Sequence, residues 1–234
     1  MNTIPPTRLF GLLFSVVTLL EIVGDIGQIK WLHYGCKPLI VGLLLAWAWR
    51  HRAVGERPMK ILRIGLIFAL LGDIFLMIQE VDLFGLGLAS FLLMQLCYCV
   101  VFRLRGAVRP VSLVTIGLTA LPFVVYAGGF LLILRPAFAT KPDLDMLWIP
   151  VVIYVVCIST MGLMAALRRG SSGYWPVLAG ALLFILSDSA IAVNSFLTPF
   201  AGSTPFIMST YATAQYLIVA YLYPTHDHHY HRSS

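Results

Sequence analysis

Charged side chains are scarce in this chain. Aspartate, glutamate, lysine and arginine make up 11% of its 234 residues, whereas 59% are hydrophobic. A soluble domain usually carries about 25% charged residues. One globular core is too small to hide so much apolar surface from water, but a lipid bilayer accommodates it. The composition therefore excludes an ordinary soluble domain and predicts an integral membrane protein.

Cysteine is also rare, and the familiar catalytic signatures are missing. Cys97 and Cys99 are too close together for a zinc site, so the four cysteines are interpreted as small apolar side chains. The sequence has no Gly-x-Ser-x-Gly elbow, no phosphate-binding loop and no His-Glu-x-x-His motif. The histidine-rich tail at 226–234 is interpreted as a solvated cytoplasmic segment. We therefore predict no resident metal and no cofactor.

Long apolar runs are what the sequence does contain. A transmembrane helix needs about 20 mostly apolar residues, and eight runs approach that length. They predict an all-α, polytopic membrane bundle of about eight transmembrane helices, in a single domain over residues 1–225. The expected spans are Thr7–Gly24, Leu32–Trp49, Ile61–Ile78, Leu83–Phe102, Val111–Leu134, Met146–Leu167, Tyr174–Leu197 and Pro205–Tyr223.

The first two spans allow alternative interpretations. The first resembles a signal peptide, but no small-x-small cleavage site follows and Glu21 and Asp25 close the run, so we expect it to be retained. The second is firmly apolar only from Pro38, after a stretch that carries His33 and Lys37. It is interpreted either as a full span or as a short helix after a partly re-entrant segment. No histidine is placed firmly within a span.

The distribution of positive charge predicts the orientation. Of the 16 lysines and arginines, twelve fall in the termini and loops on one side of the predicted bundle and four on the other. Basic residues concentrate on the cytoplasmic side of membrane proteins. Both termini are therefore expected to be cytoplasmic, in the inner (cell) membrane of a bacterium. The same clusters account for the net charge of +6 without a nucleic-acid partner.

The third and seventh predicted spans contain a short internal repeat. The stretch Gly65–Asp73 resembles Gly180–Asp188, with both glycines and both aspartates offset by 115 residues. Four spans return a chain to its starting side, so a four-plus-four duplication would be parallel rather than inverted. The predicted halves are residues 1–109 and 110–225.

Asp73 and Asp188 are the strongest candidates for chemistry. A carboxylate inside a membrane span is costly, so it normally faces the bundle interior and serves a function. The alternative is a structural clamp in which each aspartate hydrogen-bonds a neighbouring helix. Both aspartates lie toward the predicted outer ends of their spans, where Glu21, Asp25 and Lys37 are also expected to gather. Two neighbouring buried carboxylates do not titrate alike, so one can remain protonated while the other is ionised.

Several other polar side chains fall inside predicted spans and are candidates for binding or support. Each can equally form an ordinary interhelical hydrogen bond, which is the usual role of a lone amide in a membrane. Ser195 lies seven residues after the second aspartate and shares its helix face, whereas Asn194 is less well aligned. The amide candidates are Gln95, Asn194 and Gln215, and the hydroxyl candidates are Tyr98, Tyr154, Tyr211 and Tyr216.

The arrangement of these residues resembles the YhhN family, whose characterised animal members are lysoplasmalogenases. The glycine–aspartate and serine–aspartate pairs are the most specific elements of the resemblance, which extends over about four-fifths of the chain. Where the family pattern leads us to expect a histidine in the fourth span, this chain has Gln95. The matching stretches are Lys37-Pro38, Gly72-Asp73 within Gly65–Ile78, Phe84–Leu86, Phe91 through Tyr98 to Phe102, Gly180–Asp188 and Ala214–Ile218.

The resemblance implies hydrolysis of the vinyl-ether bond of a lysoplasmalogen, giving a fatty aldehyde and a glycerophospho-base. The predicted residues suit this chemistry, because protonation on carbon needs a positioned acid and the resulting cation is stabilised by a carboxylate. Asp73 and Asp188 are the implied pair, and Lys37 or Lys30 would bind the phosphate. The alternative from the same residues is a lipid-binding protein or a proton-coupled transporter. The expected partners are a lysophospholipid and the membrane itself.

Overall fold

The computed structural model describes residues 7–50, 57–78, 82–106, 112–140 and 142–222. These residues form eight long helices, one short helix and one π-helical turn, and no strand occurs among them. The elements are α1 (Arg8–Ile26), α2 (Lys30–Arg50), α3 (Arg57–Met77), α4 (Phe84–Leu104), α5 (Leu113–Thr140), α6 (Pro142–Asp145), α7 (Trp148–Ala166), α8 (Tyr174–Ala192), η1 (Val193–Leu197) and α9 (Ser203–Leu222).

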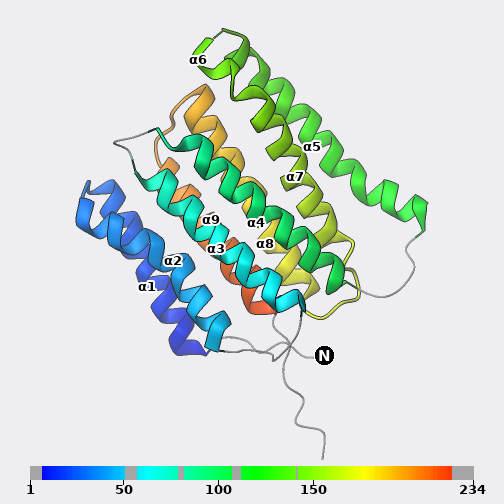
Figure 1. The fold of residues 1–234 in the computed structure, drawn as a ribbon, viewed down its shortest axis with the longest axis horizontal. Coiled ribbons are helices and arrows are strands. Elements are labelled where there is room, and N and C mark those ends of the chain that lie inside the picture. Colours follow the sequence, from blue (N-terminus) through cyan, green and yellow to red (C-terminus); the bar gives the residue numbers. More distant parts are fainter. Residues whose placement is uncertain (1–6, 51–56, 79–81, 107–111, 141, 223–234) are drawn as a thin grey trace, which may run out of the picture.

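The long helices form an up-and-down bundle (Figure 1). The pair α1 and α2 lies on one side, α3, α4, α8 and α9 form the middle, and α5 lies outermost against α7. Eight large aliphatic side chains of α5 are exposed. By length and apolar composition, five helices in the described part of the chain can cross a membrane, namely α1, α4, α5, α7 and α8 with η1. The protein is therefore an all-α integral membrane protein.

The helices α2, α3 and α9 have a more polar composition, and some of their polar side chains lie inside the bundle. His33, Asp73 and Gln215, one from each helix, are all buried. Each helix is still 20 or 21 residues long. Every one of the eight expected spans overlaps one long helix, so the predicted all-α bundle of about eight helices is confirmed.

The interpretation of the second span as a short helix after a re-entrant segment is wrong. The helix α2 is continuous from Lys30 to Arg50 and accommodates Pro38 in its interior. The stretch before Pro38 is less apolar because it carries Lys30, His33 and Lys37, and the buried His33 lies next to a carboxylate of α1 rather than facing lipid. His33 lies in the first turn of this helix and is buried there.

The two glycines of the internal repeat have the same packing role. A Cβ atom on Gly65 would lie 3.1 Å from the side chains of Cys97 and Tyr98 on α4. A Cβ atom on Gly180 would lie 2.9 Å from the backbone oxygen of Ala214 on α9. Each glycine thus lets its helix approach the next one closely. The four-plus-four repeat itself stays a prediction, and the tail at 226–234 lies outside the described residues.

Candidate active site

A polar cavity of about 260 Å³ lies among α1, α2, α3, α8 and α9. It occupies the end of the bundle where α1 joins α2 and where α8 leads through η1 into α9 (Figure 1). Four helices contribute the predicted charged residues to its wall, which are Glu21, Asp25, Lys37, Asp73 and Asp188. The structure therefore brings together carboxylates and a lysine that are far apart in the sequence.

Asp73 is held from the bundle interior by a chain of buried hydrogen bonds. Its side chain on α3 is 3% exposed, and the hydroxyl of Tyr211 donates to its Oδ2 at 2.9 Å. Gln215 Nε2 lies 3.4 Å from the same tyrosine oxygen and donates to it. The hydroxyl of Tyr98 in turn donates to Gln215 Oε1 at 2.6 Å. These hydrogen bonds hold one carboxylate oxygen of Asp73 in place, while the side chain of Asp73 still lines the cavity.

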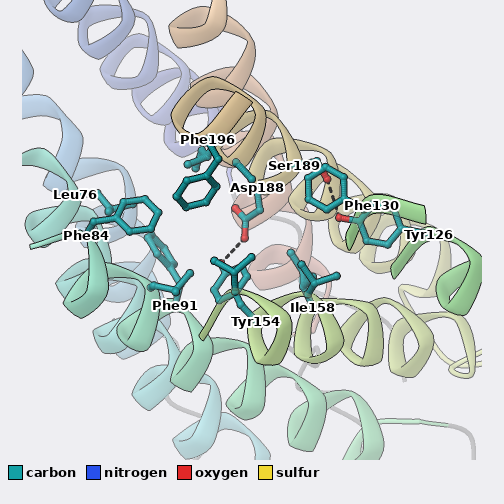
Figure 2. Close-up of a pocket in the computed structure, with 15 residues that line it drawn as sticks. Leu76, Phe84, Phe91, Tyr126, Phe130, Tyr154, Ile158, Asp188, Ser189 and Phe196 are labelled. Carbon is teal, nitrogen blue, oxygen red and sulfur yellow. Dashed lines mark hydrogen bonds between the residues drawn. The ribbon is translucent and has the colours of Figure 1, made fainter. Parts of the chain in front are cut away.

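Asp188 lies where the polar cavity meets a second, apolar cavity. Its Oδ2 accepts a hydrogen bond from the hydroxyl of Tyr154 on α7 (Figure 2). It lines both cavities, together with Leu76, Phe84 and Phe91. We call the second cavity the apolar slot. The carboxyl group of Asp188 thus lies at the boundary between the polar cavity and the apolar slot.

The apolar slot lies between α4, α5, α7 and α8 and is lined mostly by aromatic and aliphatic side chains. Figure 2 shows Phe84, Phe130 and Phe196 around it, with Ile158 and Tyr154 on α7. At its edge, the hydroxyls of Tyr126 and Ser189 are 2.8 Å apart and hydrogen-bonded. The free volume of the slot is about 50 Å³, and its lining suits a short stretch of hydrocarbon, because the hydroxyls of Tyr126, Tyr154 and Ser189 are already hydrogen-bonded.

A cluster of charged groups lines the opposite part of the polar cavity. Glu21 is fully buried on α1, and its Oε1 lies 3.3 Å from Nδ1 of His33 on α2. The same nitrogen lies 3.5 Å from Oδ1 of Asp25, whose Oδ2 accepts a hydrogen bond of 2.6 Å from Thr204 on α9. Lys37, one turn after His33 on α2, also lines the cavity.

His33 is the residue that sequence reasoning missed. The signal was present, because Glu21 and Asp25 are four residues apart on one helix, as are His33 and Lys37 on the next. Residues at that spacing share a helix face. Two facing helices with such pairs can bring acidic and basic groups together, and the loop that joins α1 to α2 is short enough to make those helices neighbours.

Four of the predicted supporting residues, Gln95, Tyr98, Asn194 and Gln215, line neither cavity. Gln95 is fully buried on α4 and lines neither of them. Tyr98 and Gln215 act on Asp73 only through Tyr211. Asn194 accepts a hydrogen bond from the backbone of Phe200 at 3.3 Å. Ser195, the better aligned neighbour, does line the polar cavity.

The described residues contain no group of three or more histidine, cysteine, aspartate or glutamate side chains that could hold a metal ion. The histidines of the tail lie outside the described residues.

Comparison with known proteins assigns the chain to a family. The model of the YhhN family matches residues 32–222. The chain belongs to the YhhN family. The matched range includes both aspartates, His33 and Lys37, whereas Glu21 and Asp25 on α1 precede it. No solved structure matches this chain.

Three relatives of this YhhN protein carry the name lysoplasmalogenase. Human lysoplasmalogenase TMEM86A is 33% identical over 165 residues, which are 66% of this chain and 62% of the human protein. The bovine protein of the same name is 38% identical over 162 residues, with the same shares. Pig lysoplasmalogenase TMEM86B is 35% identical over 153 residues, 65% of this chain and 59% of its own length. The chain thus matches about three-fifths of the length of these relatives.

Proposed function

We propose that this YhhN protein is a membrane-embedded hydrolase that cleaves the vinyl-ether bond of lysoplasmalogens. The observation that carries the proposal is the position of Asp188 on the wall shared by the polar cavity and the apolar slot. A lysoplasmalogen likewise has an apolar and a polar part, because its vinyl ether joins a hydrocarbon chain to a polar glycerophospho group. The names of the mammalian relatives support the same reaction.

The chemistry needs an acid, an anion and water. Protonation of the vinyl carbon β to the oxygen gives an oxocarbenium ion, and water then adds to the carbon bonded to that oxygen. The hemiacetal collapses to a fatty aldehyde and a glycerol hydroxyl, and the proton released by the water replaces the one consumed. This sequence requires neither a covalent enzyme intermediate nor a cofactor.

The two aspartates divide these tasks in our scheme. Asp188 donates the proton to carbon, because it lies on the wall shared by the two cavities, where the vinyl ether would lie. Asp73 is ionised; it stabilises the oxocarbenium ion and accepts the proton of the attacking water. The hydrogen bond from Tyr211 holds its carboxylate in place for both tasks.

Lys37 binds the phosphate of the head group in this scheme. It lines the polar cavity, whereas Lys30, the other candidate, is exposed and does not. The glycerophospho group would then fill the polar cavity while the alkenyl chain enters the apolar slot. We further propose that the protein lies in a bacterial inner membrane with both termini cytoplasmic, which places the polar cavity near the outer surface.

The test is aldehyde release by the purified protein in detergent. We expect release from a 1-alkenyl lysophospholipid, and none from the corresponding saturated alkyl ether, which cannot be protonated on carbon. Fatty acid should not be released from a 1-acyl lysophospholipid at a comparable rate. Uptake of lysolipid by vesicles that depends on a proton gradient, with no aldehyde formed, would instead identify a transporter.

A further inference from the structure

The turn between α7 and α8 places a buried arginine at the end of the bundle opposite the polar cavity (Figure 1). Its sequence is Arg168-Arg169-Gly-Ser-Ser-Gly173. Arg168 is only 2% exposed, and its guanidinium carbon lies 5.8 Å from the ring centre of Phe102 on α4. Arginine is seldom buried to this degree without a negatively charged partner.

No anion satisfies this guanidinium within the described part of the chain. Its Nη2 donates to the backbone oxygens of Arg105 at 3.5 Å and Ser172 at 3.3 Å, both longer than ordinary hydrogen bonds. Its Nε and Nη1 are buried without a hydrogen-bond partner, and so is the hydroxyl of Ser171. Burial and the nearby charge of Arg105 lower the pKa of Arg168 to about 10. The surroundings therefore disfavour its charge, as expected of a site that lacks its anion.

The N-terminus of α8 adds a second attraction for an anion at the same turn. Gly173 precedes the helix with φ of +69°, and no side chain caps the first turn. In the first turn the N–H of Tyr174 already donates to the backbone oxygen of Ser171 and Pro176 has no N–H, so the N–H of Trp175 and the helix dipole are what favour a negative group there. The bond from Arg168 to the backbone of Ser172 puts the guanidinium beside this turn.

We propose that Arg168, Ser171 and the N-terminus of α8 bind a phosphate group, supplied by an anionic phospholipid of the leaflet at this end. The planar guanidinium fork matches two phosphate oxygens, and the hydroxyl of Ser171 adds a donor. A lipid source is favoured by Trp175, which is 74% exposed next to the turn, because exposed tryptophans anchor helices at the membrane interface. Exposed Arg169 adds a further positive charge that attracts anionic lipid.

Thermal unfolding in a neutral detergent tests the site. Phosphatidylglycerol should raise the Tm of the wild type by several degrees, whereas phosphatidylcholine should have a much smaller effect. Arg168→Gln should lose this increase. The matched control Arg169→Gln removes the same charge from the exposed neighbour and should keep most of it. The phosphate group could come from a lipid or from free phosphate, so inorganic phosphate is compared with chloride at equal ionic strength. If inorganic phosphate raises the Tm as much as phosphatidylglycerol does, free phosphate is the ligand of the same site.

Two results would overturn the proposal. One is a wild type whose Tm rises with neither phosphatidylglycerol nor phosphate. The other is an Arg168→Gln protein that unfolds at lower temperature but keeps the full increase, because Arg168 would then only hold the backbone of α4 and the turn. If that variant does not fold, Arg168→Lys replaces it: it retains the charge without the planar fork and should show a reduced increase, and an undiminished one would contradict the site.

Discussion

Replacing Asp188 with asparagine removes the proposed acid and leaves the shape of the site intact. Loss of a general acid or base lowers turnover by about 10²–10⁴-fold. The amide oxygen of the asparagine can still accept a hydrogen bond from the hydroxyl of Tyr154. The free energy of unfolding should therefore change by less than about 1 kcal/mol. Alanine would leave that buried hydroxyl unpaired and should cost about 1–3 kcal/mol. The same expectations hold for Asp73 and its bond from Tyr211.

The assay combines aldehyde release from an alkenyl lysophospholipid with thermal unfolding in detergent. Asp82→Asn is the matched control, because this exposed aspartate only accepts the backbone N–H of Phe84 at the start of α4, which asparagine also does. The Asp73→Asn, Asp188→Asn double variant should be little slower than either single one, since the pair acts as a unit. Full activity in both single asparagine variants would refute the catalytic assignment and favour the structural clamp.

Three further expectations follow from the site and the bundle. Lys37→Gln should raise KM roughly tenfold for the lysophospholipid but not for an alkenylglycerol without phosphate. Lys30→Gln should leave the KM of both substrates unchanged. Equal effects of Lys37→Gln on the two substrates would contradict a phosphate contact. His33→Gln should lower kcat/KM about tenfold by leaving Glu21 and Asp25 without their basic partner, and unaltered kinetics would place His33 outside the reaction. Reporter fusions in the α4–α5 and α7–α8 connections should read cytoplasmic and those between α3 and α4 external; the reverse pattern would invert the proposed orientation.

The sequence predicted the helices because a membrane span leaves a strong local signal. Each transmembrane helix needs its own run of apolar residues, and these runs could be located in the sequence one at a time. The start of α2 was harder to predict for a physical reason, since a buried polar contact such as that of His33 with Glu21 lowers the hydropathy of a segment without breaking its helix. Local composition cannot distinguish a polar residue that faces a partner from one that ends a span.

The partners of the aspartates could not be predicted in the same way. Asp73 and Asp188 occupy equivalent places in the predicted repeat, yet Asp73 accepts a hydrogen bond from Tyr211 of α9 and Asp188 accepts one from Tyr154 of α7. Which helices are neighbours depends on how the whole bundle packs, and no short stretch of sequence encodes it. For the same reason Gln95 could be recognised as buried, but not as lying away from the cavities.

Hydrolysis in heavy water tests the central claim most directly, because carbon protonation by an aspartic acid leaves a label in the product. The purified protein is given an alkenyl lysophospholipid in D₂O, and the aldehyde is trapped at once by reduction and analysed by mass spectrometry. The account predicts an aldehyde of full chain length with a single deuterium on the carbon next to the carbonyl, formed by the wild type and almost absent with Asp188→Asn. Unlabelled aldehyde, a shortened chain, or undiminished labelling by that variant would contradict it.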